Sequence, residues 1–226
     1  MYPVITIDGP SGTGKGTLCH MLAKYLHWHV LDSGVLYRVL AYAAQENGIA
    51  LNNINALIIL NSQLKILFVE DSSNHRQILL NGKNISEVIR SEQCGQNASK
   101  IGVIAEVRQA LLDSQRAFVK PPGLVADGRD MGTVIFPNAR LKLYLDATSE
   151  ERSKRRYYQL RNQGIDVSLA DIMADLIARD TRDAARLAAP LKPAADAIYI
   201  DTTNLNITQL FDFVVELVES KGVCES

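Results

Sequence analysis

The feature that most constrains the fold is a glycine-rich segment between a short apolar run and a stretch of helical periodicity. The apolar run spans residues 4–8 (VITID), the glycine-rich segment spans 9–17 (GPSGTGKGT), and the helical stretch continues to residue 26. A strand, a glycine-rich turn and a helix, in this order, form the context in which G-x-x-x-x-G-K cradles phosphate. Glycines let backbone N–H groups turn towards an anion, and the helix N-terminus adds its positive dipole end. The segment predicts an α/β fold with a phosphate site at the end of the first strand.

Lys15 is the cation expected to neutralise the outer phosphates of a nucleoside triphosphate bound at this loop. The residues predicted to surround the donor phosphates are contiguous: Gly9, Pro10, Ser11, Gly12, Thr13, Gly14, Lys15, Gly16 and Thr17. Gly16 stands where such loops commonly carry a magnesium-binding Ser or Thr. We therefore expect Mg²⁺ to be held through water, with Thr17 and Asp127 as the candidate residues. The alternative for Asp127, at the end of a later apolar run, is an N-cap or an ordinary turn residue.

Four further apolar runs are expected to join the same sheet, at residues 29–32, 124–127, 141–146 and 197–201. Segments of helical period separate them, for example at 35–46. Strands that alternate with helices predict βαβ units with right-handed crossovers. The expected fold is therefore a five-stranded parallel sheet flanked by helices, in one domain that spans residues 1–226.

Two segments interrupt this alternation. Between residues 64 and 89 the apolar period falls to two, with a polar turn at 71–74 and a tight-turn signal at Asn81-Gly82. This stretch predicts a small antiparallel insert, and a long helix from about 91 to 120, bent at Gly102, should return the chain to the main sheet. The second interruption, residues 149–187, reads as two helices hinged near 162–164 and is dense in arginine. Acidic residues are interspersed there, so a solvated charged face is the alternative interpretation.

Composition excludes several classes of protein. The formal net charge of −1 lacks the basic excess of a typical nucleic-acid binder. No apolar run approaches the roughly 20 residues of a membrane span, and the N-terminus lacks the pattern of a signal peptide. Three widely spaced cysteines (Cys19, Cys94 and Cys224) have no metal-ligand spacing. We therefore expect a soluble cytoplasmic protein, and no apolar stripe argues against a monomer.

Three further motifs sharpen the expectation. They are DSGVLYR at 32–38, DGRDMGT at 127–133 and RDTRDAARLAAP at 179–190. Together with the G-K-G-T form of the loop, they closely resemble those of bacterial cytidylate kinases, and the resemblance covers almost the whole chain. It implies transfer of a phosphoryl group from ATP to CMP or dCMP, giving CDP or dCDP and ADP, with Mg²⁺ as the metal.

The resemblance also implies roles for individual residues on the acceptor side. Asp130 would accept from the N4 amino group of cytosine, while Arg108 and Ser99 would donate to its acceptor atoms. The remaining CMP-binding residues would engage the phosphate and the sugar: Ser33, Arg38, Arg129, Arg179, Asp183 and Arg186. Residues 34–97 would form the acceptor-binding insert region. Packing in a helix is the alternative for Ser99 and Arg108, and a solvated position is the alternative for Arg38. For Asp130 the alternative is a surface ion pair with Arg129.

Catalysis of phosphoryl transfer rests mainly on positioning and on cations that stabilise spreading negative charge. The residues predicted for this task are Lys15, Arg129, Arg155, Arg156 and Arg186. Residues 149–187 would be a mobile lid that closes over both nucleotides and excludes water. A related kinase for UMP or AMP is the nearest alternative. A GTPase-like switch would call for a guanine-reading N-K-x-D stretch, which the chain lacks, and a nucleic-acid-processing ATPase fits the net charge poorly.

Overall fold

The computed structural model describes residues 2–70, 76–186 and 188–223. The chain divides into two compact units. The first combines Met1–Asp32 with Gln115–Ser226, and the second is Ser33–Ser114.

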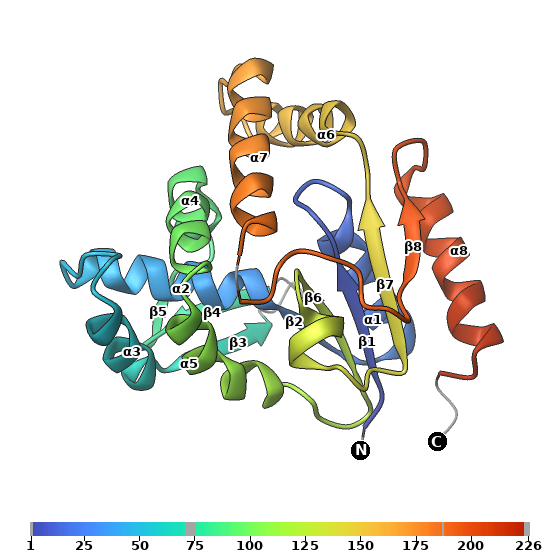
Figure 1. Ribbon diagram of the computed structural model, residues 1–226, viewed down its shortest axis with the longest axis horizontal. Helices are drawn as coiled ribbons and strands as arrows, with labels where there is room; N and C mark the ends of the chain where they lie inside the picture. The colour runs from blue at the N-terminus through green and yellow to red at the C-terminus, as the bar shows by residue number, and fades with distance from the viewer. Residues whose placement is uncertain (1, 71–75, 187, 224–226) are drawn as a thin grey trace. The chain divides into compact units, whose positions relative to one another are not determined.

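The first unit is built on a five-stranded sheet in the order β2-β6-β1-β7-β8, and every neighbouring pair is parallel (Figure 1). The strands are β1 (Val4–Asp8), β2 (His29–Asp32), β6 (Leu124–Gly128), β7 (Leu141–Asp146) and β8 (Ile198–Asp201). All five predicted strands are confirmed, and their bounds agree with the expected ranges to within one residue. The central strand β1 is buried along its whole length, as expected for a parallel sheet covered on both faces.

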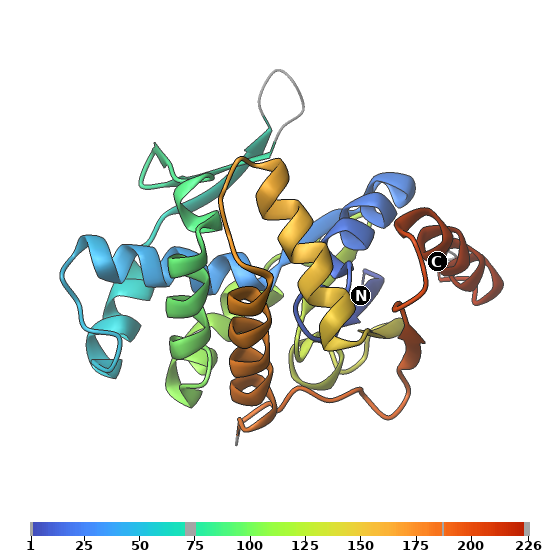
Figure 2. The ribbon, with the colours of Figure 1, turned by 90° about the horizontal axis from the view of Figure 1, so that it is seen from above.

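One face of this sheet packs against α1 (Lys15–Leu26) and α8 (Ile207–Ser220). Ile5 and Ile7 of β1, which alternate towards this face, are fully buried against Leu18 and Leu22 of α1. Figure 2 shows α8 beside α1, and its apolar positions complete the same core. Because the loop between β1 and α1 joins two elements of this core, the phosphate-binding segment has a rigid base.

Two helices of the first unit follow β7: α6 (Ser149–Asn162) and α7 (Leu169–Ala184). Thr148 and Ser168 cap their N-termini with side-chain oxygens, which satisfies backbone donors that the helix leaves open. Gly164 adopts φ +76° between them, a conformation that favours glycine. The predicted pair of arginine-rich helices with a hinge near 162–164 is confirmed.

The second unit contains α2 (Ser33–Glu46), α3 (Ile54–Gln63), a three-stranded antiparallel sheet, the 3₁₀ turn η1 (Val88–Arg90) and two further helices. The strands are β3 (Ile66–Glu70), β4 (Arg76–Leu80) and β5 (Lys83–Asn84). Asn81 and Gly82 have φ of +50° and +85°, so the predicted tight turn is confirmed. The short β5, which that turn makes possible, was not predicted. The expected polar turn at 71–74 lies outside the described residues.

The expected long helix at 91–120 is wrong as a single element. The chain forms α4 (Glu92–Ile101) and α5 (Ala105–Arg116), with Gly102 closing the first helix. Glycine is a poor helix residue, and a helix end must find partners for its last carbonyl groups. Arg108 supplies one: its Nη1 donates to the Gly102 carbonyl at 3.1 Å. A break, rather than a bend, is therefore stable here.

Candidate active site

The loop from Gly9 to Gly14 joins β1 to α1 and has the geometry of an anion cradle. Gly9, Gly12 and Gly14 adopt φ of +141°, +84° and +92°, which turn the peptide planes in ways that other residues rarely allow. Gly14 caps α1 without a side-chain hydrogen bond. The first N–H groups of α1 thus lack a capping side chain and can meet an anion, which the helix dipole favours.

Lys15 lies under this loop and is almost fully buried. Its Nζ donates to the Pro10 carbonyl at 2.6 Å and lies 3.5 Å from Thr13 Oγ1. Burial, followed by the neighbouring Arg129, lowers the pKa of Lys15 to about 7 against the opposing effect of Asp127. A polyphosphate in the loop would favour the charged form of this lysine.

Carboxylates gather where β1, β2 and β6 end. Asp32 and Asp127 are register partners on β2 and β6, and Ile7, which precedes Asp8, pairs with Asp127. Burial is the main cause that raises the pKa of Asp127 to about 7; Lys15 opposes this increase, and Asp32 adds to it. Burial likewise raises the pKa of Asp8 to about 6. Asp8 accepts from the backbone N–H groups of Met131 and Gly132, both at 2.8 Å, and so holds the π-type turn η2 (Met131–Ile135).

These carboxylates bear on the expected magnesium site. Mg²⁺ commonly binds one or two carboxylates together with waters and substrate phosphates. A Cβ added at Gly16 would lie 3.3 Å from Asp127 Oδ2, so this carboxylate lies beside the first turn of α1, where the phosphate-binding loop ends. The position of the Asp127 carboxylate therefore fits a divalent cation held through water. Thr17 is exposed on the first turn of α1, and the described residues contain no cluster of three or more His, Cys, Asp or Glu side chains that could hold a metal by itself.

A chain of ionic contacts joins the loop to α7. Arg129 Nη2 donates to Ser11 Oγ at 2.7 Å, and its Nε donates to Asp183 Oδ2 at 2.9 Å. Arg186 donates to the other carboxylate oxygen of Asp183. Asp183 is 1% exposed, so two guanidinium groups share one buried carboxylate. Burial alone would raise the pKa of Asp183, but Arg129, Arg186 and Arg179 together hold it below its usual range.

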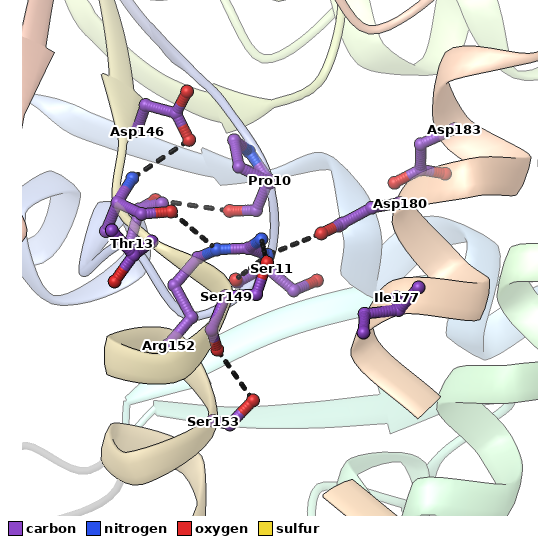
Figure 3. Close-up of polar contacts among 12 residues, drawn as sticks. Pro10, Ser11, Thr13, Asp146, Ser149, Arg152, Ser153, Ile177, Asp180 and Asp183 are labelled. Atoms are coloured by element: carbon purple, nitrogen blue, oxygen red, sulfur yellow. Dashed lines mark hydrogen bonds and ion pairs between the residues drawn. The ribbon is translucent and has the colours of Figure 1, made fainter. Parts of the chain in front are cut away.

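Arg152 is a second link between the loop and α7 (Figure 3). Its Nη1 donates to the Ser11 carbonyl at 3.1 Å and to Asp180 Oδ2 at 2.6 Å, while its Nε donates to the Ala147 carbonyl at 3.0 Å. A Cβ added at Gly12 would come within 2.9 Å of Arg152 Cβ. The loop therefore packs directly on the first turn of α6, and only glycine fits at this point.

The two neighbouring arginines of α6 differ in their contacts. Arg155 donates to the carbonyl of Thr202 at 2.5 Å and to its hydroxyl at 3.1 Å, and its Nε donates to Glu151 at 3.0 Å. Arg156 instead donates to Gln159 at 2.9 Å on the exposed side of the helix. Arg155 is therefore bound to the loop that follows β8.

The remaining predicted residues divide between the two units. Ser33, Arg38, Ser99 and Arg108 belong to the second unit, in which Ser33, Ser99 and Arg108 are buried. Arg38 donates to the carbonyls of Ile89 and Ser91 at 2.6 and 3.0 Å. Asp130, Arg179 and Asp183 belong to the first unit, where Asp130 is 3% exposed. The shared role of these two sets in binding an acceptor stays a prediction.

Sequence reasoning missed three contributors to the site. Asp8 lay within a predicted strand, Asp180 lay inside the 179–190 motif without an assigned role, and Thr202 followed the last strand with no motif of its own. Arg152 was seen only as one arginine among several in the 149–187 segment. A short polar residue at the carboxyl end of a parallel strand is the one signal that could have marked Asp8 and Thr202, because ligands meet α/β sheets at that edge.

The parallel sheet, the glycine loop with its buried lysine and the surrounding arginines define the class: a P-loop phosphotransferase. A family model described as cytidylate kinase matches residues 5–220. A cytidylate kinase of Azotobacter vinelandii is 49% identical over 221 residues, which cover 97% of this chain and 96% of that protein. A cytidylate kinase of Pseudomonas fluorescens is 50% identical over 222 residues, covering 98% and 97%. The chain belongs to the cytidylate kinase family and is a kinase.

Among solved structures, shikimate kinase from Bacteroides thetaiotaomicron is 15% identical with a TM-score of 0.42, and the match covers 96% of this chain and 97% of that one. In the parts of the chain that the structure describes, no helix combines the length and apolar character needed to span a membrane.

Proposed function

We propose that this kinase transfers the γ-phosphoryl group of ATP to CMP or dCMP, giving ADP and CDP or dCDP. The observation that carries the proposal is the buried ionic chain of Ser11, Arg129, Asp183 and Arg186. It links the phosphate-binding loop to the helix whose motif resembles the acceptor-binding motif of cytidylate kinases. Membership of that family supports CMP as the acceptor.

On the donor side, residues 9–17 bind the phosphates of ATP, and Lys15 neutralises the β- and γ-phosphates. Mg²⁺ supplies charge neutralisation of the transferred phosphoryl group when it is bound. Asp127 and Thr17 would hold this metal through water. The position of the Asp127 carboxylate beside Gly16 supports the assignment, because a cation there would relieve the cost of its burial.

On the acceptor side, Asp130 accepts a hydrogen bond from the N4 amino group of cytosine, and Arg108 with Ser99 donates to the other edge atoms. Uracil carries a carbonyl at the same position and would face the carboxylate with an acceptor, so selectivity follows from repulsion as well as attraction. Ser33, Arg38 and Arg129 engage the phosphate, Arg179 and Asp183 the ribose. Residues 34–97 form the acceptor-binding region within a single kinase domain of residues 1–226.

Transfer requires no general base, because the attacking atom is already a phosphate oxygen. Lys15, Arg129, Arg156 and Arg186 stabilise the charge that spreads over the transferred group. Residues 149–187 act as a lid that excludes water and so suppresses hydrolysis of ATP. We further propose that the enzyme acts in the cytoplasm as a monomer, which sedimentation of the purified protein would test.

The experiment that tests this function measures ADP release from Mg-ATP with CMP, dCMP, UMP, AMP and GMP offered separately. Turnover with CMP and dCMP alone is expected. The variant Asp130→Asn should lose about 10- to 100-fold in kcat/KM for CMP, the value of one charge-assisted hydrogen bond, and gain relative activity on UMP. Turnover led by UMP or AMP would refute the cytosine site, and no acceptor-dependent release would refute the kinase reaction.

A further inference from the structure

The phosphate-binding loop is held from outside at two of its carbonyl groups. Arg152 Nη1 donates to the Ser11 carbonyl at 3.1 Å. The Thr202 hydroxyl lies 3.2 Å from the Thr13 carbonyl, towards which it can donate. The hydroxyl also lies 3.0 Å from the Asp146 carbonyl, which accepts from the Thr202 backbone N–H at 2.7 Å as well. A carbonyl oxygen has two lone pairs, so the single hydroxyl proton is shared between the Asp146 and Thr13 carbonyls.

The geometry of the peptide bond gives these two contacts a consequence. In a planar trans peptide, the carbonyl of one residue and the N–H of the next point in opposite directions. A Ser11 carbonyl held outward therefore directs the N–H of Gly12 inward, and a Thr13 carbonyl held outward does the same for Gly14. Both glycines have positive φ, which lets the chain present these alternate N–H groups. Inward N–H groups are the donors that a phosphate cradle needs.

Each of the two outer contacts is itself held in place. Arg152 is 5% exposed, and the Ala147 carbonyl accepts from its Nε. Asp180 on α7 also orients its guanidinium, as Figure 3 shows. Thr202 is 1% exposed, and Arg155 donates to both its hydroxyl and its carbonyl. Because Glu151 accepts from Arg155 Nε at 3.0 Å, the second contact is also anchored on α6. The first turns of α6 thus belong to the support of the loop.

We propose that Arg152 with Asp180, and Thr202 with Arg155, are positioning residues that set the donor cradle by holding the Ser11 and Thr13 carbonyls outward. The proposal rests on the proposed ATP site and adds residues that act on it through the loop. It also reassigns Arg155, which the sequence predicted to act on the transferred group. In this arrangement Arg155 orders the loop after β8 and influences phosphate binding through Thr202.

The test compares Asp180→Asn and Thr202→Val with the wild-type enzyme. Inorganic tripolyphosphate, bound in a calorimetric titration, isolates the cradle from any contact with a base. Each variant is expected to bind tripolyphosphate about tenfold more weakly, which equals about 1.4 kcal/mol at 25 °C. The KM for ATP should rise by a similar factor, while the KM for CMP and the kcat at saturating ATP stay within about twofold, since only donor binding loses its preorganisation.

The matched control is Asp175→Asn, the same substitution at an exposed position of α7. It should bind tripolyphosphate like the wild type. Asp180→Glu keeps the charge and should recover part of the affinity, which also covers the case in which Asp180→Asn fails to fold. Tripolyphosphate affinities of Asp180→Asn and Thr202→Val equal to that of the control would overturn the proposal.

Arg155→Lys separates the two roles of that residue. Lysine can reach a carbonyl but cannot join Glu151 and Thr202 with one rigid group, so a raised KM for ATP with a preserved kcat is expected. A fall in kcat at saturating ATP with unchanged KM would return Arg155 to the transferred group and overturn its reassignment. If CMP proved not to be the acceptor, the proposed function would fail, while the tripolyphosphate titration would still decide the roles of Asp180 and Thr202.

Discussion

Replacing Asp183 by asparagine should be among the most destabilising single changes in the first unit. The carboxylate is 1% exposed and accepts from Arg129 and Arg186, whose side chains are only 16% and 6% exposed. Asparagine keeps the shape but removes the negative charge, which leaves two buried guanidinium groups with weaker partners. Breaking a buried ion pair in this way typically costs about 3–5 kcal/mol, and two charge-assisted hydrogen bonds at about 1.5–3 kcal/mol each give a similar figure.

Urea unfolding of Asp183→Asn and wild type, followed by circular dichroism, measures this loss. The pH dependence supplies a second check. The arginines lower the pKa of Asp183 in the folded protein. Its contribution to the free energy of unfolding is therefore fully present above the unfolded-state pKa of about 3.9, and it is lost as the pH falls through the lower pKa of the folded state. The difference between variant and wild type should therefore shrink below about pH 4.

The exposed Asp175→Asn serves as the control and should change the free energy of unfolding by less than about 0.5 kcal/mol. A loss below about 1 kcal/mol for Asp183→Asn at pH 7 would refute the buried-pair reasoning, since such a value is typical of an exposed pair. So would a difference that stays constant as the pH is lowered well below 4.

Three further changes test other parts of the site. Gly9→Ala should cost about 4 kcal/mol in urea unfolding, because the added Cβ at φ +141° would lie 2.0 Å from the Leu145 carbonyl oxygen; a stable variant would contradict the backbone geometry. Burial raises the pKa of Asp8 from 3.8 to about 6, so the folded protein binds this proton more tightly than the unfolded chain does. The free energy of unfolding should therefore fall by up to about 3 kcal/mol as the pH rises from 4 to 6. Asp8→Asn should show a smaller decline, and an equal decline would exclude Asp8 as its source. The pKa of Lys15 is lowered to about 7, chiefly by burial, so this lysine is mostly neutral at pH 8 and becomes protonated when an anion binds beside it. Tripolyphosphate binding at pH 8 should therefore take up close to one proton in the wild type and less in Lys15→Met, as measured by calorimetry in buffers of different ionisation enthalpy. Equal uptake in both proteins would assign the proton to another group.

Local pattern predicted most of the first unit. Each strand of the parallel sheet is a short apolar run. In the second unit, the period of two between residues 64 and 89 predicted the antiparallel insert. These signals are reliable because a strand or helix repeats its burial along a contiguous segment. The helix break at Gly102 was missed because its stabilising partner, Arg108, lies six residues further along and outside any capping pattern.

The sequence by itself determined the class of protein, since the phosphate loop, Lys15 and the arginine-rich motifs are contiguous and can be read directly. Only the tertiary structure decided how these parts support one another. Arg152 meets Ser11 across 141 residues, Thr202 meets Thr13 across 189, and Asp8 meets Gly132 across 124. Such contacts depend on which side-chain conformers the packed elements allow. A linear pattern records the kind of residue at each position, but the direction in which a buried arginine donates follows from the backbone carbonyls and carboxylates that the fold brings to it.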